Sequence, residues 1–162
     1  MASTESGQSR RGRPLNLMAV DAEDLQVVST LLQDAILVLP DLTWQADRRR
    51  FAMLVNRFRW EAAGFRAQRK GITERVRSLL VADSVQKVAS RGLGLPESTN
   101  QDPLSVLSVA FDPGDLPAGA LRIRFSGNAT IRLDVECLDL TLRDVTRPYR
   151  APSGAIPVHD LS

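Results

Sequence analysis

The feature that most constrains this chain is a regular alternation of apolar and polar residues between Leu121 and Val145. Apolar side chains occupy every second position in residues 121–125 and again in 131–135, and the segment 126–129 between them has turn-forming composition. Neighbouring residues of a strand point to opposite faces of a sheet, so this spacing predicts two antiparallel strands with one buried and one exposed face. The stretch predicts a fold but identifies no chemistry.

The turn between these two strands decides which residues face each other. A two-residue turn at 127–128 would place apolar residues opposite charged ones along the whole pair, so we expect a loop of odd length or a bulge. We expect Phe125 to lie opposite Ile131, which also places Arg122 opposite Asp134, an attractive pair on the outer face.

A helix is expected near the N-terminus. Asp21 can cap it, with Asp24 at the third helical position and Glu23 favoured by the helix dipole. Its apolar stripe would pack on the sheet; docking a partner is the alternative reading. The stripe consists of Leu25, Val27, Val28, Leu31, Leu32 and Ala35.

Further strands are indicated between residues 35 and 88. Residues 35–39 indicate a short strand stopped by Pro40. Residues 42–46 and 51–61 predict a hairpin with an arginine cluster at its tip, and 75–81 with 85–88 predict a second hairpin.

Two features mark the second half of the chain. Leu107, Val109 and Phe111 alternate with other residues as in a half-buried strand. The apolar positions then change parity at residues 137–138, which predicts a bulge, bend or strand break there.

Together these elements predict an α+β fold that is mainly antiparallel β. One N-terminal helix would pack on a strongly bent sheet or partly closed barrel of about seven to nine strands, since sheets of this size usually curl. A barrel of the pleckstrin-homology type and a two-layer sandwich both fit. We expect a disordered basic arm at 1–16, a single domain at 17–147 and a C-terminal tail at 148–162 that is flexible unless Tyr149 or Ile156 pins it to the body.

The charges are unevenly distributed, although the net charge is only +2. Residues 48–91 hold twelve Lys or Arg against three acids, whereas residues 92–145 hold eight acids against four arginines. This asymmetry indicates either an anionic partner or neutralisation of one half by the other. Aromatic residues interleave with arginines at 57–60, a pattern that nucleic-acid-binding sheets and ordinary half-buried strands share. The candidate binding residues are Arg48, Arg49, Arg50, Arg57, Arg59, Arg66, Arg69 and Lys70.

Catalytic and metal-binding signals are weak. His159 is the only histidine and Cys137 the only cysteine, which argues against a catalytic triad, a disulfide within the chain or a cysteine-based metal site. We interpret Cys137 as a buried core residue rather than a nucleophile. Asp134, Glu136 and Asp139 could bind Mg²⁺, but pairing with neighbouring arginines explains them better. We therefore expect no metal and no cofactor.

Several stretches resemble one family of bacterial proteins. These are FAMLVNRFRWE from residue 51, ERVRSLLVADSV from residue 74, the following SRG, and IRLDVECLDLTLRDV from residue 131. The resemblance is to an uncharacterised domain-of-unknown-function family and covers about residues 17–147. Its genes often lie beside a histidinol dehydrogenase gene, which implies a loose link to housekeeping metabolism. The family supplies no catalytic residues to transfer.

Three functions follow as expectations. The first is a non-catalytic cytoplasmic module that binds an unknown protein partner or self-associates through a strand edge or the helix face. The second is binding of nucleic acid or another polyanion by the basic segment 48–91. The third is a small-ligand-binding protein or carboxylate enzyme that uses Glu61 or Asp139. No apolar run is long enough for a membrane span, so we expect no membrane partner.

Overall fold

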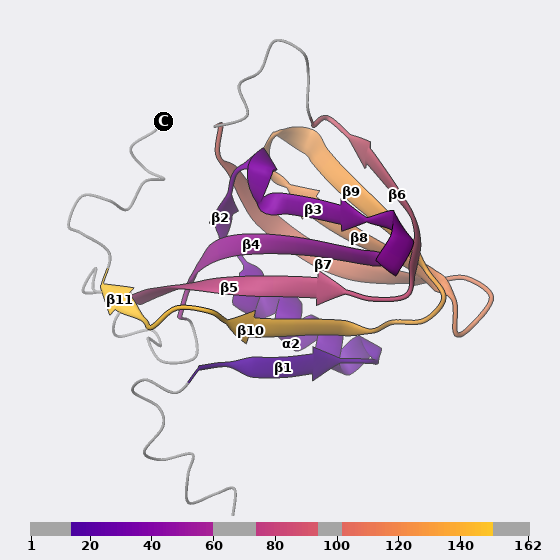
Figure 1. The fold of residues 1–162 in the computed structure, drawn as a ribbon, viewed down its shortest axis with the longest axis horizontal. Coiled ribbons are helices and arrows are strands. Elements are labelled where there is room, and N and C mark those ends of the chain that lie inside the picture. Colours follow the sequence, from indigo (N-terminus) through magenta and orange to yellow (C-terminus); the bar gives the residue numbers. More distant parts are fainter. Residues whose placement is uncertain (1–13, 60–73, 94–101, 151–162) are drawn as a thin grey trace, which may run out of the picture.

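The computed structural model describes residues 14–59, 74–93 and 102–150, and in this part of the chain eleven strands form one antiparallel sheet beside one α-helix (Figure 1). From edge to edge the strand order is β1-β10-β5-β4-β2-β7-β8-β9-β6, with β3 paired to β4 and β11 to β5. The strands are β1 (Asn16–Ala19), β2 (Ile36–Leu37), β3 (Leu42–Gln45), β4 (Arg50–Phe58), β5 (Glu74–Ala82), β6 (Val85–Arg91), β7 (Leu104–Pro113), β8 (Gly119–Phe125), β9 (Ala129–Val135), β10 (Leu140–Asp144) and β11 (Tyr149–Arg150). The α-helix is α2 (Ala22–Leu32), and the 3-10 turns are η1 (Leu39–Asp41), η2 (Ala46–Arg48) and η3 (Ser126–Asn128).

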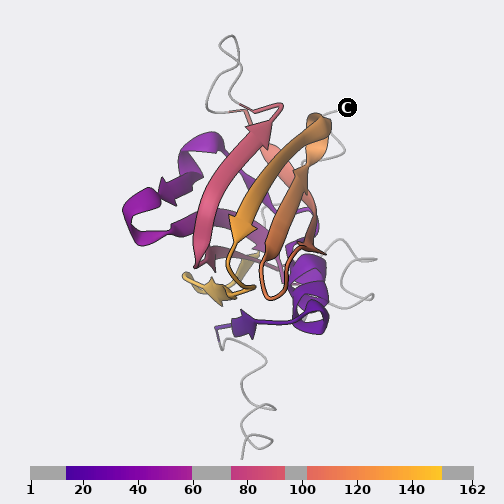
Figure 2. The same ribbon diagram turned by 90° about the vertical axis from the view of Figure 1, so that its right-hand side faces the viewer.

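The sheet curls into two facing layers that enclose one core (Figure 2). The first layer contains β1, β10, β5 and β4, and the second contains β7, β8, β9 and β6. β2 links them, because Ile36 lies opposite Asn56 of β4 on one side and Ser105 of β7 on the other. Helix α2 contacts β7, β1 and β4. β1 and β6 remain as the ends of the sheet, which confirms the predicted α+β fold with a bent, unclosed sheet.

Helix α2 begins where the sequence predicts. The Asp21 carboxylate accepts a hydrogen bond of 2.9 Å from the Asp24 amide, and the Asp24 carboxylate accepts one of 3.2 Å from the Val20 amide. The first bond satisfies an amide of the first helical turn, and the second ties the residue before the cap to the helix. Val27 is half exposed, so its assignment to the buried stripe is wrong. The residues that α2 buries are Leu25, Val28, Leu31 and Leu32.

The second predicted hairpin does not form. β5 ends at Ala82 and β6 begins at Val85, yet β5 pairs with β4 and β10 while β6 pairs with β9. The chain turns at Ser84, which has a φ of +61°, and passes from the first layer to the second. Local residues specify a turn, but pairing with distant strands decides whether that turn closes a hairpin or leads to another layer.

The predicted strand break near residue 137 is confirmed. β9 ends at Val135 in the second layer and β10 begins at Leu140 in the first. Leu138 is buried between them. Cys137 is partly exposed, so its interpretation as a buried core residue is wrong.

The register of β8 and β9 differs from the expected one by two residues. The loop has three residues, Ser126–Asn128, so its predicted odd length is confirmed. Both Gly127 and Asn128 have positive φ angles, which lets the loop close directly onto Ala129. Arg122 therefore lies opposite Arg132 and not opposite Asp134.

A bulge changes which β7 residues are buried. The register shifts between Val106 and Ser108, so Val106 and Val109 are both buried. Leu107 consequently lies on the exposed side, with 42% of its surface accessible. The alternation in the sequence predicts this strand but misassigns Leu107.

Two short strands were not predicted. β1 pairs with β10, and β11 pairs with β5. With them the described part of the sheet exceeds the expected seven to nine strands. Tyr149 pins β11 as predicted, because its hydroxyl accepts a hydrogen bond of 2.7 Å from the Asn56 side chain.

Candidate anion-binding site

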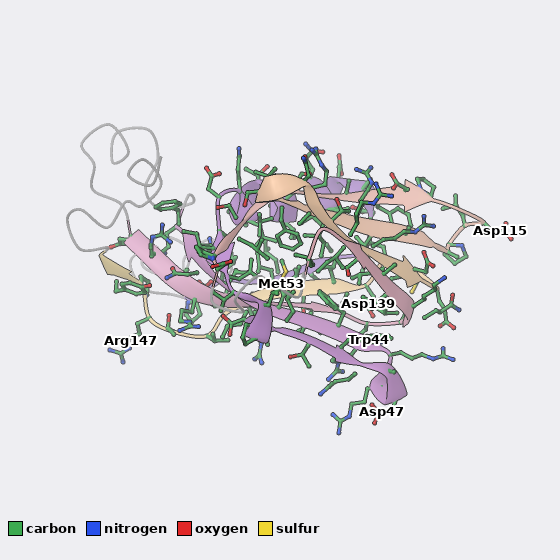
Figure 3. All side chains as sticks on the ribbon, turned by 90° about the horizontal axis from the view of Figure 1, so that it is seen from above. Trp44, Asp47, Met53, Asp115, Asp139 and Arg147 are labelled. Carbon is green, nitrogen blue, oxygen red and sulfur yellow. The ribbon has the colours of Figure 1, made fainter. Side chains whose placement is uncertain are left out.

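The arginine cluster predicted at a hairpin tip does lie there, between β3 and β4, beside the turn residue Asp47 (Figure 3). Arg48 and Arg49 belong to the turn, Arg50 begins β4, and all three are exposed. Arg49 forms an ion pair of 2.8 Å with Glu136, and Arg50 forms one of 2.8 Å with Asp83. Two of the three charges are thus compensated by the chain itself.

Arg57 lies inside the molecule. It continues the inward-facing row of β4 that begins with Phe51, and it has no accessible surface. Its guanidinium forms an ion pair of 2.9 Å with Asp144 and donates to Ser78 Oγ at 2.9 Å and to the Phe58 carbonyl at 3.1 Å. A buried charge needs such partners to offset its desolvation. Arg57 is therefore a structural residue.

The aromatic and arginine alternation around Phe58 does not form an open stacking surface in the described residues. The guanidinium of Arg75 lies 4.1 Å from the centre of the Phe58 ring, a cation–π contact within the chain. Burial lowers the pKa of Arg75 from its ordinary value. Arg59 is nearly buried and forms an ion pair with Glu74. Trp60 lies outside the described residues.

The eight candidate residues do not form one surface in the described part of the chain. Arg66, Arg69 and Lys70 lie outside the described residues. The remaining five divide between an exposed turn and a buried network. Part of the charge asymmetry has an internal explanation, because Arg49 and Arg57 from the basic half pair with acids of the acidic half.

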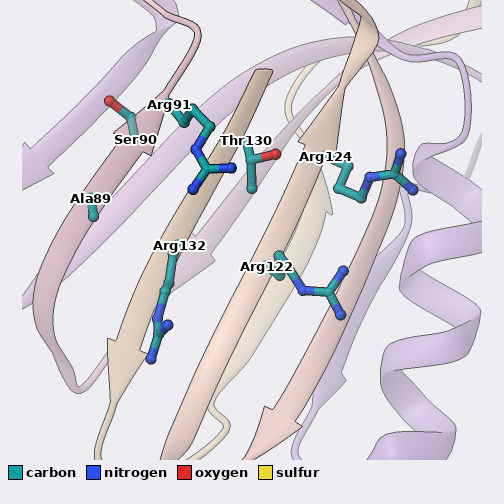
Figure 4. Close-up of a pocket in the computed structure, with 7 residues that line it drawn as sticks. All are labelled: Ala89, Ser90, Arg91, Arg122, Arg124, Thr130 and Arg132. Atoms are coloured by element: carbon teal, nitrogen blue, oxygen red, sulfur yellow. The ribbon is translucent and has the colours of Figure 1, made fainter. Parts of the chain in front are cut away.

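A different group of arginines shares one surface. The outer face of β6, β9 and β8 carries Arg91, Arg132, Arg122 and Arg124, whose side chains stand on neighbouring strands (Figure 4). Arg122 lies directly opposite Arg132, and Thr130 lies opposite both Arg91 and Arg124. We call these four arginines and Thr130 the arginine face. Like charges on facing strands repel, so this surface needs neutralising groups.

Two of the four arginines have such groups within the chain. Arg122 donates two hydrogen bonds of 2.9 Å to the Asp112 carboxylate, and Arg132 donates one of 2.9 Å to Asp134. The hydrogen bonds from Arg122 hold the pKa of Asp112 below its ordinary value, and the same contact raises the pKa of Arg122. These pairs lie on the surface, where salt screens them.

The other two arginines, Arg91 and Arg124, form no ion pair with any residue in the described ranges. Arg91 on β6 and Arg124 on β8 both lie opposite Thr130 of β9, the strand that runs between them. Adjacent strands are spaced by roughly 5 Å, so the two backbones are about 10 Å apart. Guanidinium groups at that spacing can reach one anion between them.

Two adjoining hollows lie on this face. One of about 400 Å³ is lined by Ala89, Ser90 and the arginine face. The other, of about 380 Å³, shares Arg91, Arg124 and Thr130 with the first. It adds Leu107, Phe125 and the loop residues 127–129.

Gly92 brings the end of β6 close to the η3 loop. Its φ is +78°, and a Cβ atom placed on it would lie 3.1 Å from Ala129 Cα and 3.1 Å from the Asn128 carbonyl oxygen. A side chain would be strained by the backbone angle and crowded by the loop. Glycine at this position thus lets β6 approach Asn128 and Ala129, two residues that line the second hollow.

The alternative carboxylate sites receive little support. Glu61 lies outside the described residues, and Asp139 lines none of the three described hollows. Asp134 and Glu136 pair with Arg132 and Arg49, as ordinary ion pairing predicts. No group of three or more potential metal ligands occurs among the described residues. No described helix is long and apolar enough to cross a membrane.

The arginine face was not identified from the sequence. The alternation in residues 121–135 places Arg122, Arg124 and Arg132 on an outer face, and this was the available signal. Arg91 joins them only because β6 pairs with β9, a contact between residues more than thirty positions apart. The expected pairing of 75–81 with 85–88 would have placed Arg91 elsewhere.

Comparison with known proteins identifies the family. A family model described as "Protein of unknown function (DUF2948)" matches residues 15–159. No curated protein and no solved structure matches the chain. Because this family model matches almost all of the sequence, the chain belongs to the DUF2948 family of proteins of unknown function.

Proposed function

We propose that this chain is a non-catalytic binding module that holds an anionic partner on its arginine face. The observation that carries the proposal is the pair Arg91 and Arg124, which lack an ion-pair partner among the described residues and flank a hollow. Guanidinium groups bind phosphate and carboxylate oxygens bidentately. The described residues that line the two hollows include no carboxylate, histidine or cysteine that could serve as a general base or nucleophile.

This proposal combines two of the expected functions and relocates the site. A protein, a nucleic acid or a small molecule with negative groups could each occupy the arginine face. The buried position of Arg57 and Arg59 and the ion pairs of Arg49 and Arg50 favour this face over the segment 48–91. The apolar face of α2 is packed in the core, so self-association would have to use another surface.

The test uses fluorescein-labelled heparin as a general polyanion, with anisotropy measured at several salt concentrations. We expect binding that weakens as salt rises. The double variant Arg91→Ala/Arg124→Ala should lose most of the affinity and flatten the salt dependence by roughly one unit of log–log slope per arginine removed.

Two variants serve as controls. Arg77→Ala/Arg143→Ala removes the same charge from exposed positions on the first layer and should bind nearly as well as the parent chain. Arg48→Ala/Arg49→Ala/Arg50→Ala tests the hairpin tip. Losses that depend only on the number of charges removed in the three variants would show that net charge alone governs binding and would contradict the proposed site.

A further inference from the structure

The uncompensated charge of the arginine face is concentrated at one end. Asp112 and Asp134 neutralise Arg122 and Arg132, whereas Arg91 and Arg124 retain two full positive charges beside Thr130. A long polyanion is best matched by a continuous row of free cations along a surface. Two arginines on the strands that flank Thr130 match a single, doubly charged group instead.

We propose that Arg91 and Arg124 bind the dianionic phosphate of a small organic phosphate monoester. This inference rests on the proposed function and specifies its anionic ligand. A phosphate monoester carries a charge of about −1.5 to −2 at pH 7 and has three acceptor oxygens, which two guanidinium groups can balance. Arginine at each side can donate two hydrogen bonds in a planar fork, so the pair recognises the geometry of phosphate as well as its charge.

Thr130 adds a neutral donor to this site. Thr130 stands between the two arginines in the strand register, on the same face of the sheet (Figure 4). Hydroxyl groups donate to phosphate oxygens that the guanidinium groups leave free. The site thus presents donors from three neighbouring strands of a rigid sheet.

The second hollow would hold the organic part of the ligand. It adjoins the phosphate position through Arg91, Arg124 and Thr130, and its volume of about 380 Å³ lies in the range of small-molecule sites. Leu107 offers an exposed apolar surface, because the β7 bulge turns it away from the core. Asn128 provides an amide for a polar group of the ligand.

The described lining does not favour a nucleic-acid base. Phe125 is the aromatic residue in the described lining, and it has 1% of its surface accessible. Single-stranded nucleic acids usually bind by stacking bases on exposed aromatic rings. A compact ligand with a terminal phosphate fits this surface better than a polynucleotide.

The test measures whether phenyl phosphate displaces labelled heparin from the full-length chain, with phenyl sulfate and dimethyl phosphate as singly charged comparators. We expect phenyl phosphate to compete clearly better than both. Affinity should fall as pH decreases through about 6, where the phosphate dianion takes up a proton and becomes a monoanion. Arg91→Ala and Arg124→Ala should each weaken phenyl phosphate binding about tenfold or more, the loss of a charge-assisted hydrogen bond.

The variant Arg91→Lys keeps the positive charge but loses the planar guanidinium, so it separates the effect of charge from that of geometry. It should bind phenyl phosphate more weakly than the parent chain. Arg77→Ala/Arg143→Ala is the matched control and should bind normally.

If heparin binds through the arginine face while the three small anions compete equally, the monoester inference is overturned and the proposed function stands. If heparin does not bind, both fail. A phosphoserine peptide that binds much more tightly than phenyl phosphate would overturn the assignment to a small molecule.

Discussion

At the scale of single residues, Arg57 is a charged side chain with no accessible surface. Its position in β4 follows the apolar alternation of Phe51, Met53 and Val55, so the backbone directs it into the core. There Asp144, Ser78 and the Phe58 carbonyl provide the partners that a buried guanidinium requires. A sequence can indicate the alternation, but it cannot indicate that an arginine occupies an inward position, since the partner Asp144 is 87 residues away.

Substitution of Asp144 tests this network. Asp144→Asn removes the carboxylate charge that lies 2.9 Å from the buried Arg57 guanidinium, so we expect a loss of about 3 kcal/mol in the free energy of unfolding. Urea denaturation measures the loss. Asp115→Asn, at an exposed position, is the matched control and should change stability by less than about 0.5 kcal/mol. Similar stabilities for the two variants would contradict a structural role for the pair.

The Arg122 and Asp112 pair gives a residue-scale prediction about pH. The hydrogen bonds from Arg122 lower the pKa of Asp112 in the folded chain, so the pair stabilises the fold above the unfolded-state pKa of this carboxyl. That contribution is lost as pH falls through the lowered folded-state value. In the variant Arg122→Gln, carbon-detected NMR titration should show the Asp112 pKa returning toward its ordinary value. An unchanged value would mean that Arg122 does not hold the carboxyl in solution.

At the scale of elements, the loop between β8 and β9 and the end of β6 form one unit. The alternation in residues 121–135 predicts the two strands and an odd loop, and both are present. The register was misassigned because two successive residues with positive φ close the loop sooner than expected. Glycine and asparagine tolerate this conformation, but their presence does not fix the number of loop residues.

Two glycine substitutions test how tightly this unit is packed. Gly92 and Gly127 have nearly equal φ angles of +78° and +76°, so Ala at either position incurs a similar backbone strain of about 1–2 kcal/mol. A Cβ on Gly92 also crowds the loop, whereas a Cβ on Gly127 meets no atom within 4 Å. Thermal or urea unfolding should therefore show Gly92→Ala to be the less stable variant. Equal losses would indicate that the loop moves away from β6 without cost.

The pairing of β6 is the element-scale feature on which the candidate site depends. The residues of β5 and β6 indicate two strands and a turn, and all three exist. Whether such a turn closes a hairpin is decided by pairing with distant strands, here β4, β10 and β9. The local residue pattern therefore predicts these elements correctly but predicts the wrong partner strand for β6. With the wrong partner, Arg91 is not placed on the arginine face.

At the scale of the whole molecule, the fold class was predictable and the site was not. Alternating segments with one amphipathic helix allow few architectures other than a bent antiparallel sheet, and the chain adopts one. A binding surface, by contrast, depends on which strands become neighbours. The local excess of positive charge in 48–91 pointed to a segment whose described arginines are partly buried or paired. Charge density along a sequence therefore did not predict charge density on the surface.

The curl of the sheet gives the two outer surfaces different roles. The core lies between the layers, so each layer presents an independent outer face to solvent. On the second layer this face carries the arginines and both hollows. The first layer presents Arg77 and Arg143, which makes it the natural internal reference for any experiment on charge.

The most direct test of the central claim is an NMR titration of the ¹⁵N-labelled chain with phenyl phosphate, following backbone amide shifts. We expect the largest shifts at Arg91, Arg124 and Thr130, with smaller ones in the adjoining η3 loop and little change at the η2 turn. Arg91→Ala/Arg124→Ala should abolish these shifts while the rest of the spectrum is retained. Shifts centred on residues 48–50, or spread evenly over both layers, would contradict an anion site on the arginine face.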